Sequence, residues 1–158
     1  MSDPIPPLKH RNSKDEEAVR GLYRQLLEAW NQRDAGRFAA LFEEDANAVG
    51  FDGSMMNGRG EIEFELSRIF ADHVTAAYLG IIRQVRFPAT DTAVLRAVCG
   101  MVPPGKRDIN PAVNAVQALV AVKREGGWRI ALYQNTPAQF HGRPELAQSL
   151  TEELRKLL

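Results

Sequence analysis

The stretch that decides the fold covers residues 17–34 and reads EAVRGLYRQLLEAWNQRD. Its apolar residues recur at the spacing of one helical face, at Ala18, Val19, Leu22, Tyr23, Leu26, Leu27 and Trp30. A polar turn ends this helix, and Asp34 is placed to cap a short second helix that carries Phe38, Leu41 and Phe42. An amphipathic helix of this kind must lie across an apolar surface, and the rest of the chain supplies a sheet.

From Tyr78 onward the apolar period changes to two, which predicts strands over residues 79–87, 92–102, 113–124 and 127–135. Before them, a short strand is expected over 46–51, hairpin turns at Asp52-Gly53 and Asn57-Gly58, and a third helix from about Gly60. A leucine stripe predicts a final helix over 145–158. Helices followed by an antiparallel meander are typical of the α+β class, in which helices cover one face of the sheet.

The length of 158 residues suits one domain with a real core. Residues 1–12 contain three prolines without apolar periodicity, and we expect them to form a disordered arm. The core domain is expected over 13–140, and the C-terminal helix over 141–158.

Charge and hydropathy exclude several partners. The 20 basic residues are balanced by 20 acidic ones, so no run of positive charge favours nucleic acid. No apolar stretch approaches the roughly 20 residues that span a bilayer, and residues 1–14 lack the apolar core of an export signal. Cys99 is the one cysteine, which fits a reducing compartment, so we expect a cytoplasmic protein without membrane or nucleic-acid partners.

Two of the expected strands are apolar on both faces. Residues 93–99 are interrupted by Arg96 alone, and residues 115–122 by Gln117 alone. A sheet with one solvated face alternates cleanly, so both faces are expected to be covered. The helices cover one face, and a second copy of the sheet in a two-fold homodimer covers the other. The alternative is that the C-terminal helix folds back over that face.

Several short motifs, in this order, resemble the nuclear transport factor 2-like superfamily, also called SnoaL-like. They are Trp30–Asp34, Phe42, Phe51–Gly53, Gly58–Ile62 and Gly127–Ile130. Within that superfamily, Leu119–Val122 and Gln134–Pro137 are similar to the SgcJ/EcaC group of bacterial proteins. The resemblance covers about residues 15–140.

The resemblance implies a cone, in which a curved, mixed sheet is wrapped around a pocket that helices close (a nuclear transport factor 2-like, or cystatin-like, fold). It also implies frequent dimers and, for the SgcJ/EcaC group, a place beside polyketide and enediyne biosynthesis. Related proteins include acid–base enzymes such as ketosteroid isomerase as well as non-catalytic association domains, so the fold does not fix the function.

The sequence gives no sign of a cofactor. His10, His73 and His141 do not have the spacing of metal ligands. Gly58-Arg59-Gly60 begins like a dinucleotide fingerprint, but Glu63 stands where the third glycine is required. Cys99 lies in an apolar strand, where a thiol packs rather than reacts. We therefore expect no metal, no flavin and no other cofactor.

General acid–base chemistry or ligand binding by polar groups in an apolar pocket is the class that remains. The candidate ligand-binding residues are Tyr23, Trp30, Phe51, Phe70, Arg96, Gln117 and Gln134. Arg96 and Gln134 are expected to orient a carbonyl or carboxylate while Tyr23 and Trp30 close the mouth. Each also has a structural alternative: Tyr23 and the other aromatic residues pack in the core, Arg96 pairs across a dimer, and the two glutamines satisfy each other or the backbone.

Two functions follow from these observations. The first is binding of a hydrophobic small molecule in bacterial polyketide-type or enediyne-type biosynthesis, with acid–base catalysis or protection of an intermediate. The second is a non-catalytic homodimerisation module whose pocket is filled by side chains. The sequence does not decide whether the protein is an enzyme.

Overall fold

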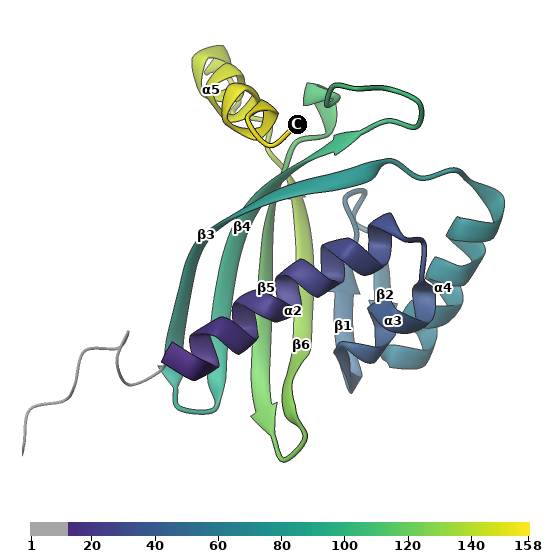
Figure 1. The fold of residues 1–158 in the computed structure, drawn as a ribbon, viewed down its shortest axis with the longest axis vertical. Helices are drawn as coiled ribbons and strands as arrows, with labels where there is room; N and C mark the ends of the chain where they lie inside the picture. Colours follow the sequence, from purple (N-terminus) through teal and green to yellow (C-terminus); the bar gives the residue numbers. More distant parts are fainter. Residues whose placement is uncertain (1–12) are drawn as a thin grey trace, which may run out of the picture.

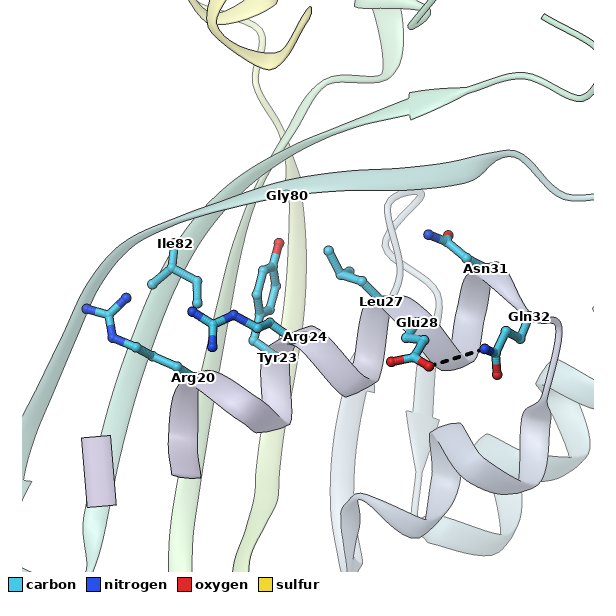
Figure 2. Close-up of a pocket in the computed structure, with 9 residues that line it drawn as sticks. All are labelled: Arg20, Tyr23, Arg24, Leu27, Glu28, Asn31, Gln32, Gly80 and Ile82. Atoms are coloured by element: carbon cyan, nitrogen blue, oxygen red, sulfur yellow. Dashed lines mark hydrogen bonds between the residues drawn. The ribbon is translucent and has the colours of Figure 1, made fainter. Parts of the chain in front are cut away.

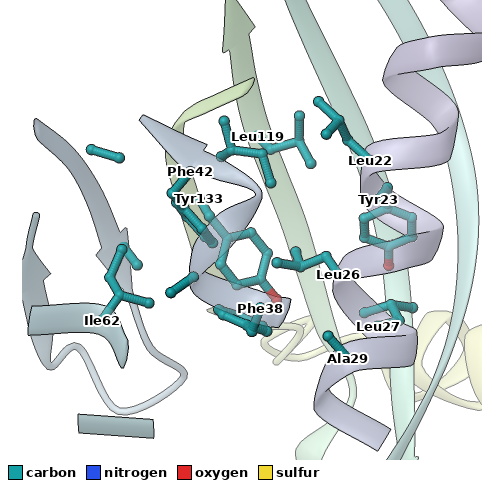
Figure 3. Close-up of a cluster of buried hydrophobic side chains, with 14 of the residues drawn as sticks. Leu22, Tyr23, Leu26, Leu27, Ala29, Phe38, Phe42, Ile62, Leu119 and Tyr133 are labelled. Carbon is teal, nitrogen blue, oxygen red and sulfur yellow. The ribbon is translucent and has the colours of Figure 1, made fainter. Parts of the chain in front are cut away.

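The long amphipathic helix predicted at the start of the fold is present and lies across a curved sheet (Figure 1). The computed structural model describes residues 13–158, so the arm expected over residues 1–12 lies outside the described part. Helix α2 covers Ser13–Asn31. Its side chains Leu22, Tyr23, Leu26 and Leu27 belong to the buried core, and Leu22 and Leu26 extend toward Leu119 and Tyr133 (Figure 3).

Short elements follow α2 and close one side of the sheet. Helix α3, Ala35–Ala40, begins at the predicted cap, because Oδ1 of Asp34 accepts a hydrogen bond of 3.0 Å from the amide of Arg37. Strand β1 covers Phe42–Val49 and so begins four residues earlier than expected. It forms the predicted hairpin with β2, Met55–Asn57, and helix α4 covers Arg59–Asp72.

The sheet has six strands in the order β2-β1-β6-β5-β4-β3. The strands of the meander are β3, Ala77–Ala89; β4, Thr92–Val102; β5, Ala115–Arg124; and β6, Gly127–Pro137. They pair antiparallel, whereas β1 pairs parallel with β6, so the sheet is mixed. The expected α+β class with a curved sheet and N-terminal helices is confirmed.

Strand register assigns each side chain to one of two faces. Leu95, Leu119 and Tyr133 form one row across β4, β5 and β6, and all three are buried beneath α2. The next row, Arg96, Ala118 and Gln134, must therefore point to the opposite face. We call the face that packs on α2 the inner face and the other the outer face.

Helix α2 approaches the inner face closely at Gly80 of β3. A Cβ atom at this position would lie 2.5 Å from the hydroxyl oxygen of Tyr23 and 2.6 Å from Cδ1 of Leu27. Glycine is therefore required here for packing rather than for its backbone freedom. The close contact brings Tyr23 over the middle of the sheet.

The C-terminal helix α5, Pro144–Arg155, covers one end of the outer face. Leu150 and Leu154 form a second apolar cluster with Val98 and Ile109. Two ion pairs also hold this helix, Arg83 with Glu153 and Arg155 with Asp108. At that end, the C-terminal helix therefore covers the outer face, as the alternative to a dimer predicted. The rest of the outer face includes four apolar side chains that lie beyond the cluster and are at least partly exposed, namely Val94, Val116, Val120 and Leu132.

Candidate functional site

Among the hollows that flank α2, two have volumes of about 650 Å³ each. The first is a groove between α2 and the edge strand β3, shown in Figure 2. Its arginines pair along α2 itself, Arg20 with Glu16 and Arg24 with Glu17. The groove thus lies between one helix and one strand, and its arginines are already paired.

The second hollow lies between α2, α3, α4, the β1–β2 hairpin and the inner face of the sheet, and it opens to solvent on one side. Apolar side chains make most of its wall, including those of Leu27, Leu66, Ile69, Met56 and Met101. We call it the interior cavity. Its exposed lining residues, among them Asp52, Glu61 and Arg68, mark its mouth, together with the half-buried Phe51 and Glu65. The buried side chains of Tyr133 and Asn135 mark its inner end, with the half-buried Tyr78 beside them. An apolar cavity that ends in a few converging polar groups has the character of a small-molecule site.

Aromatic side chains fix one wall of the interior cavity. The ring centroid of Trp30 lies 5.4 Å from that of Tyr78 and 5.2 Å from that of Phe70, the latter edge-to-face. The indole Nε1 of Trp30 donates a hydrogen bond of 2.9 Å to the carbonyl of Ala76. Trp30 and Phe51 therefore line the cavity, whereas Phe70 packs behind Trp30 and supports it.

A buried hydrogen-bond network stands at the inner end. The hydroxyl of Tyr23 donates to Oε1 of Gln117 at 2.6 Å. Nε2 of Gln117 donates to the hydroxyl oxygen of Tyr133 at 2.6 Å and to Oδ1 of Asn135 at 2.7 Å. Nδ2 of Asn135 also approaches the Tyr133 hydroxyl at 3.3 Å. Every one of these side chains is more than nine-tenths buried, so the bonds are strong and costly to break.

Burial keeps the ionisable groups near this network neutral. It raises the pKa of Tyr78 to about 12 and raises the pKa values of Tyr23 and Tyr133 well above their usual range. It also raises the pKa of the Cys99 thiol to about 12. The carboxylates among the described lining residues belong to the mouth, so the inner end offers phenol and amide donors rather than a base.

The structure corrects two of the expected site positions. Arg96 and Gln134 lie exposed in one row on the outer face and do not reach the cavity. Gln117 and Tyr23 do point inward, but they meet each other and do not line the cavity. The structural alternative in which Gln117 and Gln134 satisfy each other is not found, because Gln117 lies opposite Asn135 and bonds to Tyr23, Tyr133 and Asn135.

Tyr78, Tyr133 and Asn135 were missed by the sequence reasoning. A signal was available, because Tyr133 and Asn135 alternate with Gln134 and must share a face opposite to it. The structure supplies what this alternation lacks, namely which of the two faces is the inner one.

Within residues 13–158, no group of three or more His, Cys, Asp or Glu side chains is arranged to hold a metal ion. Over the same residues, none of the helices is both long and apolar enough to cross a membrane.

Comparison with known proteins agrees with this architecture. A family model described as a SnoaL-like domain matches residues 11–134. No curated protein matches the chain. A solved domain of unknown function with a cystatin-like fold from Nostoc punctiforme is 28% identical, with a TM-score of 0.77 over 91% of this chain and 92% of that one.

Two further solved structures are similar. An uncharacterised protein with a cystatin-like fold from Caulobacter vibrioides is 27% identical, with a TM-score of 0.64 over 83% of this chain and 96% of that one. A ketosteroid isomerase-like protein from Erwinia carotovora atroseptica is 17% identical, with a TM-score of 0.62 over 77% and 95% of the two chains, which shows a shared fold alone.

Proposed function

The chain belongs to the SnoaL-like domain family, and on that premise we propose that its interior cavity binds a hydrophobic small molecule. The observation that carries the proposal is the cavity itself, about 650 Å³ with a largely apolar wall and polar groups at its inner end. This volume lies in the usual range for small-molecule sites. A core filled by side chains would instead have favoured a purely structural module.

We further propose that the ligand is an intermediate of bacterial natural-product biosynthesis of the polyketide or enediyne type. The resemblance of Leu119–Val122 and Gln134–Pro137 to the SgcJ/EcaC group supports this assignment. The single cysteine, buried as a thiol, supports action in the cytoplasm. Binding or protection of the intermediate is favoured over proton abstraction, because the inner end contains neutral donors while the carboxylates stand at the mouth.

A cavity-filling variant tests the binding site. Ile69→Trp on α4 places an indole in the wall of the cavity, and the neutral fluorophore 1-aminoanthracene is the probe. We expect the wild type to bind the probe and Ile69→Trp to bind it at least about tenfold more weakly. Phe64→Trp is the matched control, because Phe64 lies on the same helix with 66% of its surface exposed. Equal binding by wild type and Ile69→Trp, or none by wild type, overturns the proposal.

The pathway assignment needs a separate experiment. Native mass spectrometry of the protein purified from its own host is expected to show a bound organic molecule with a polyketide-type mass. A protein that is consistently empty when purified in this way would contradict the assignment, even if the cavity binds 1-aminoanthracene.

A second role, homodimerisation through the outer face, is proposed alongside ligand binding. Val94, Val120 and Leu132 form a continuous apolar row across three strands there, beyond the reach of the α5 cluster. An apolar row of this kind on an open sheet favours a second copy of the same sheet as its cover. Dimerisation alone, with an unused cavity, is the alternative function of the protein.

A further inference from the structure

The donor and the acceptor of each hydrogen bond in the buried network follow from the chemistry of the side chains. The amide oxygen of Gln117 can accept but never donate, so Tyr23 must be the donor of their 2.6 Å bond. The amide nitrogen of Gln117 carries two hydrogens and has two acceptors in reach, the Tyr133 hydroxyl oxygen and Oδ1 of Asn135. Both hydrogens of the Gln117 amide are thereby used, and each bond runs from α2 toward the cavity.

Some hydrogen-bond donors therefore remain unused at the end of the network that faces the cavity. The hydroxyl oxygen of Tyr133 accepts from Gln117, and its own hydrogen is not consumed by that bond. Asn135 accepts through Oδ1, so its Nδ2 keeps two hydrogens, one of which faces Tyr133 over 3.3 Å. Tyr133 and Asn135 both line the interior cavity, which is where the remaining hydrogens can be used.

Tyr78 is a further phenol among the residues that line this end of the cavity. Burial raises the pKa of Tyr78 to about 12, so its phenol is protonated and carries a hydroxyl hydrogen of its own. The inner end therefore offers a hydrogen-bond donor to a ligand, whether the ligand contacts the hydroxyl of Tyr78 or that of Tyr133.

We infer that the ligand carries a neutral hydrogen-bond acceptor, of the ketone, ester or amide carbonyl class, which sits at the inner end against Tyr133 and Asn135. This inference rests on the proposed function of the interior cavity. The raised pKa of Tyr133 supports it, because the phenol stays protonated and able to donate. A carboxylate is disfavoured, because Arg68 is the cation among the described lining residues and it pairs with Glu65 at the mouth.

The test compares two probes that differ by one group. 2-Acetylnaphthalene has a carbonyl oxygen where 2-isopropenylnaphthalene has a methylene, and their shapes are nearly the same. The ratio of their dissociation constants is measured for wild type and for Tyr133→Phe. We expect Tyr133→Phe to reduce the preference for the ketone by about three- to tenfold, the usual worth of one hydrogen bond, and to leave hydrocarbon binding unchanged. Gln134→Ala is the control, because Gln134 is the neighbour on β6 that faces outward.

A second measurement and a substitute variant keep the test decisive. The infrared stretch of the ¹³C-labelled carbonyl should shift to lower frequency in wild type and in Gln134→Ala, but less in Tyr133→Phe. Should Tyr133→Phe fail to fold, Asn135→Leu serves instead: it is neutral, removes the other donor at the inner end, and should lower the ketone preference in the same way.

The possible outcomes separate the two proposals. Binding of both probes with the same ratio in wild type and variant, and without a carbonyl shift, overturns the inference and leaves the cavity as an apolar binding site. Binding of neither probe by wild type overturns the proposed function together with the inference.

Discussion

Tyr23 and Gln117 are 94 residues apart in sequence, yet their side chains share a buried hydrogen bond of 2.6 Å. This bond connects the first helix to the middle of the sheet within an otherwise apolar interface. Because Gln117 also holds Tyr133 and Asn135, the position of α2 and the inner end of the interior cavity are linked through one amide.

We expect Tyr23→Phe to destabilise the fold by about 1–3 kcal/mol, because it leaves the buried oxygen of Gln117 without a donor. Urea unfolding at neutral pH measures the change. The double variant Tyr23→Phe/Gln117→Leu is the control, because it removes both partners of the bond. Its cost should be less than the sum of the two single variants, and strict additivity would show that the bond does not contribute.

Gly80→Ala should also be destabilising, by about 1–3 kcal/mol, because the added methyl group would overlap Tyr23 and Leu27. Gly60→Ala is the matched control. A Cβ there meets no atom within 4 Å, and the position lies in the first turn of α4, so we expect no loss and up to about 1 kcal/mol of gain. Thermal unfolding of the two variants should therefore move in opposite directions; equal shifts would contradict the close packing of α2 on β3.

The α+β architecture could be predicted because its signals are periodic and local. Strand β4 has the bounds that its apolar spacing predicts, and the apolar face predicted from Ala18 to Trp30 lies on helix α2. Strand β1 was predicted poorly, because Glu43, Glu44 and Asp45 interrupt its alternation and its pairing with β6 is irregular between Phe42 and Asn47. A strand whose polar residues face solvent over several positions lacks the period of two that identifies a strand.

The site could be predicted only in part. Tyr23 and Gln117 were found because polar groups in apolar segments are conspicuous. Arg96 and Gln134 were selected for the same reason, but they lie on the outer face, away from the cavity. In strands that are apolar on both sides, alternation fixes which residues share a face but not which face is inner. That choice depends on α2 and α5, which pack on opposite sides of the sheet.

Stability should fall in alkaline solution. The Cys99 thiol has a pKa of about 12 in the folded protein against 9.0 as its reference value, and Tyr78 about 12 against 10.0. The folded state therefore holds protons that the unfolded state releases, so the contribution of these groups is complete below about pH 9 and is lost progressively toward pH 12. Urea unfolding from pH 7 to pH 11 measures this decline.

Cys99→Ala isolates the thiol in the same experiment. We expect the variant to be less stable than wild type at pH 7, because the buried sulfur is lost, but to show a shallower decline above pH 9. Parallel curves for wild type and variant would exclude Cys99 as a source of the alkaline slope.

The outer face gives the last prediction. If the apolar row of Val94, Val120 and Leu132 is covered by a second copy, sedimentation at micromolar concentration should give twice the chain mass of 17.6 kDa. Val120→Glu would place a charge in the middle of that row and should yield the monomer, because a buried unpaired carboxylate is costly. Phe64→Glu, on an exposed position of α4, should leave the dimer intact. A wild-type mass near 17.6 kDa would contradict the dimer, and α5 would then be the only element known to cover the outer face within residues 13–158.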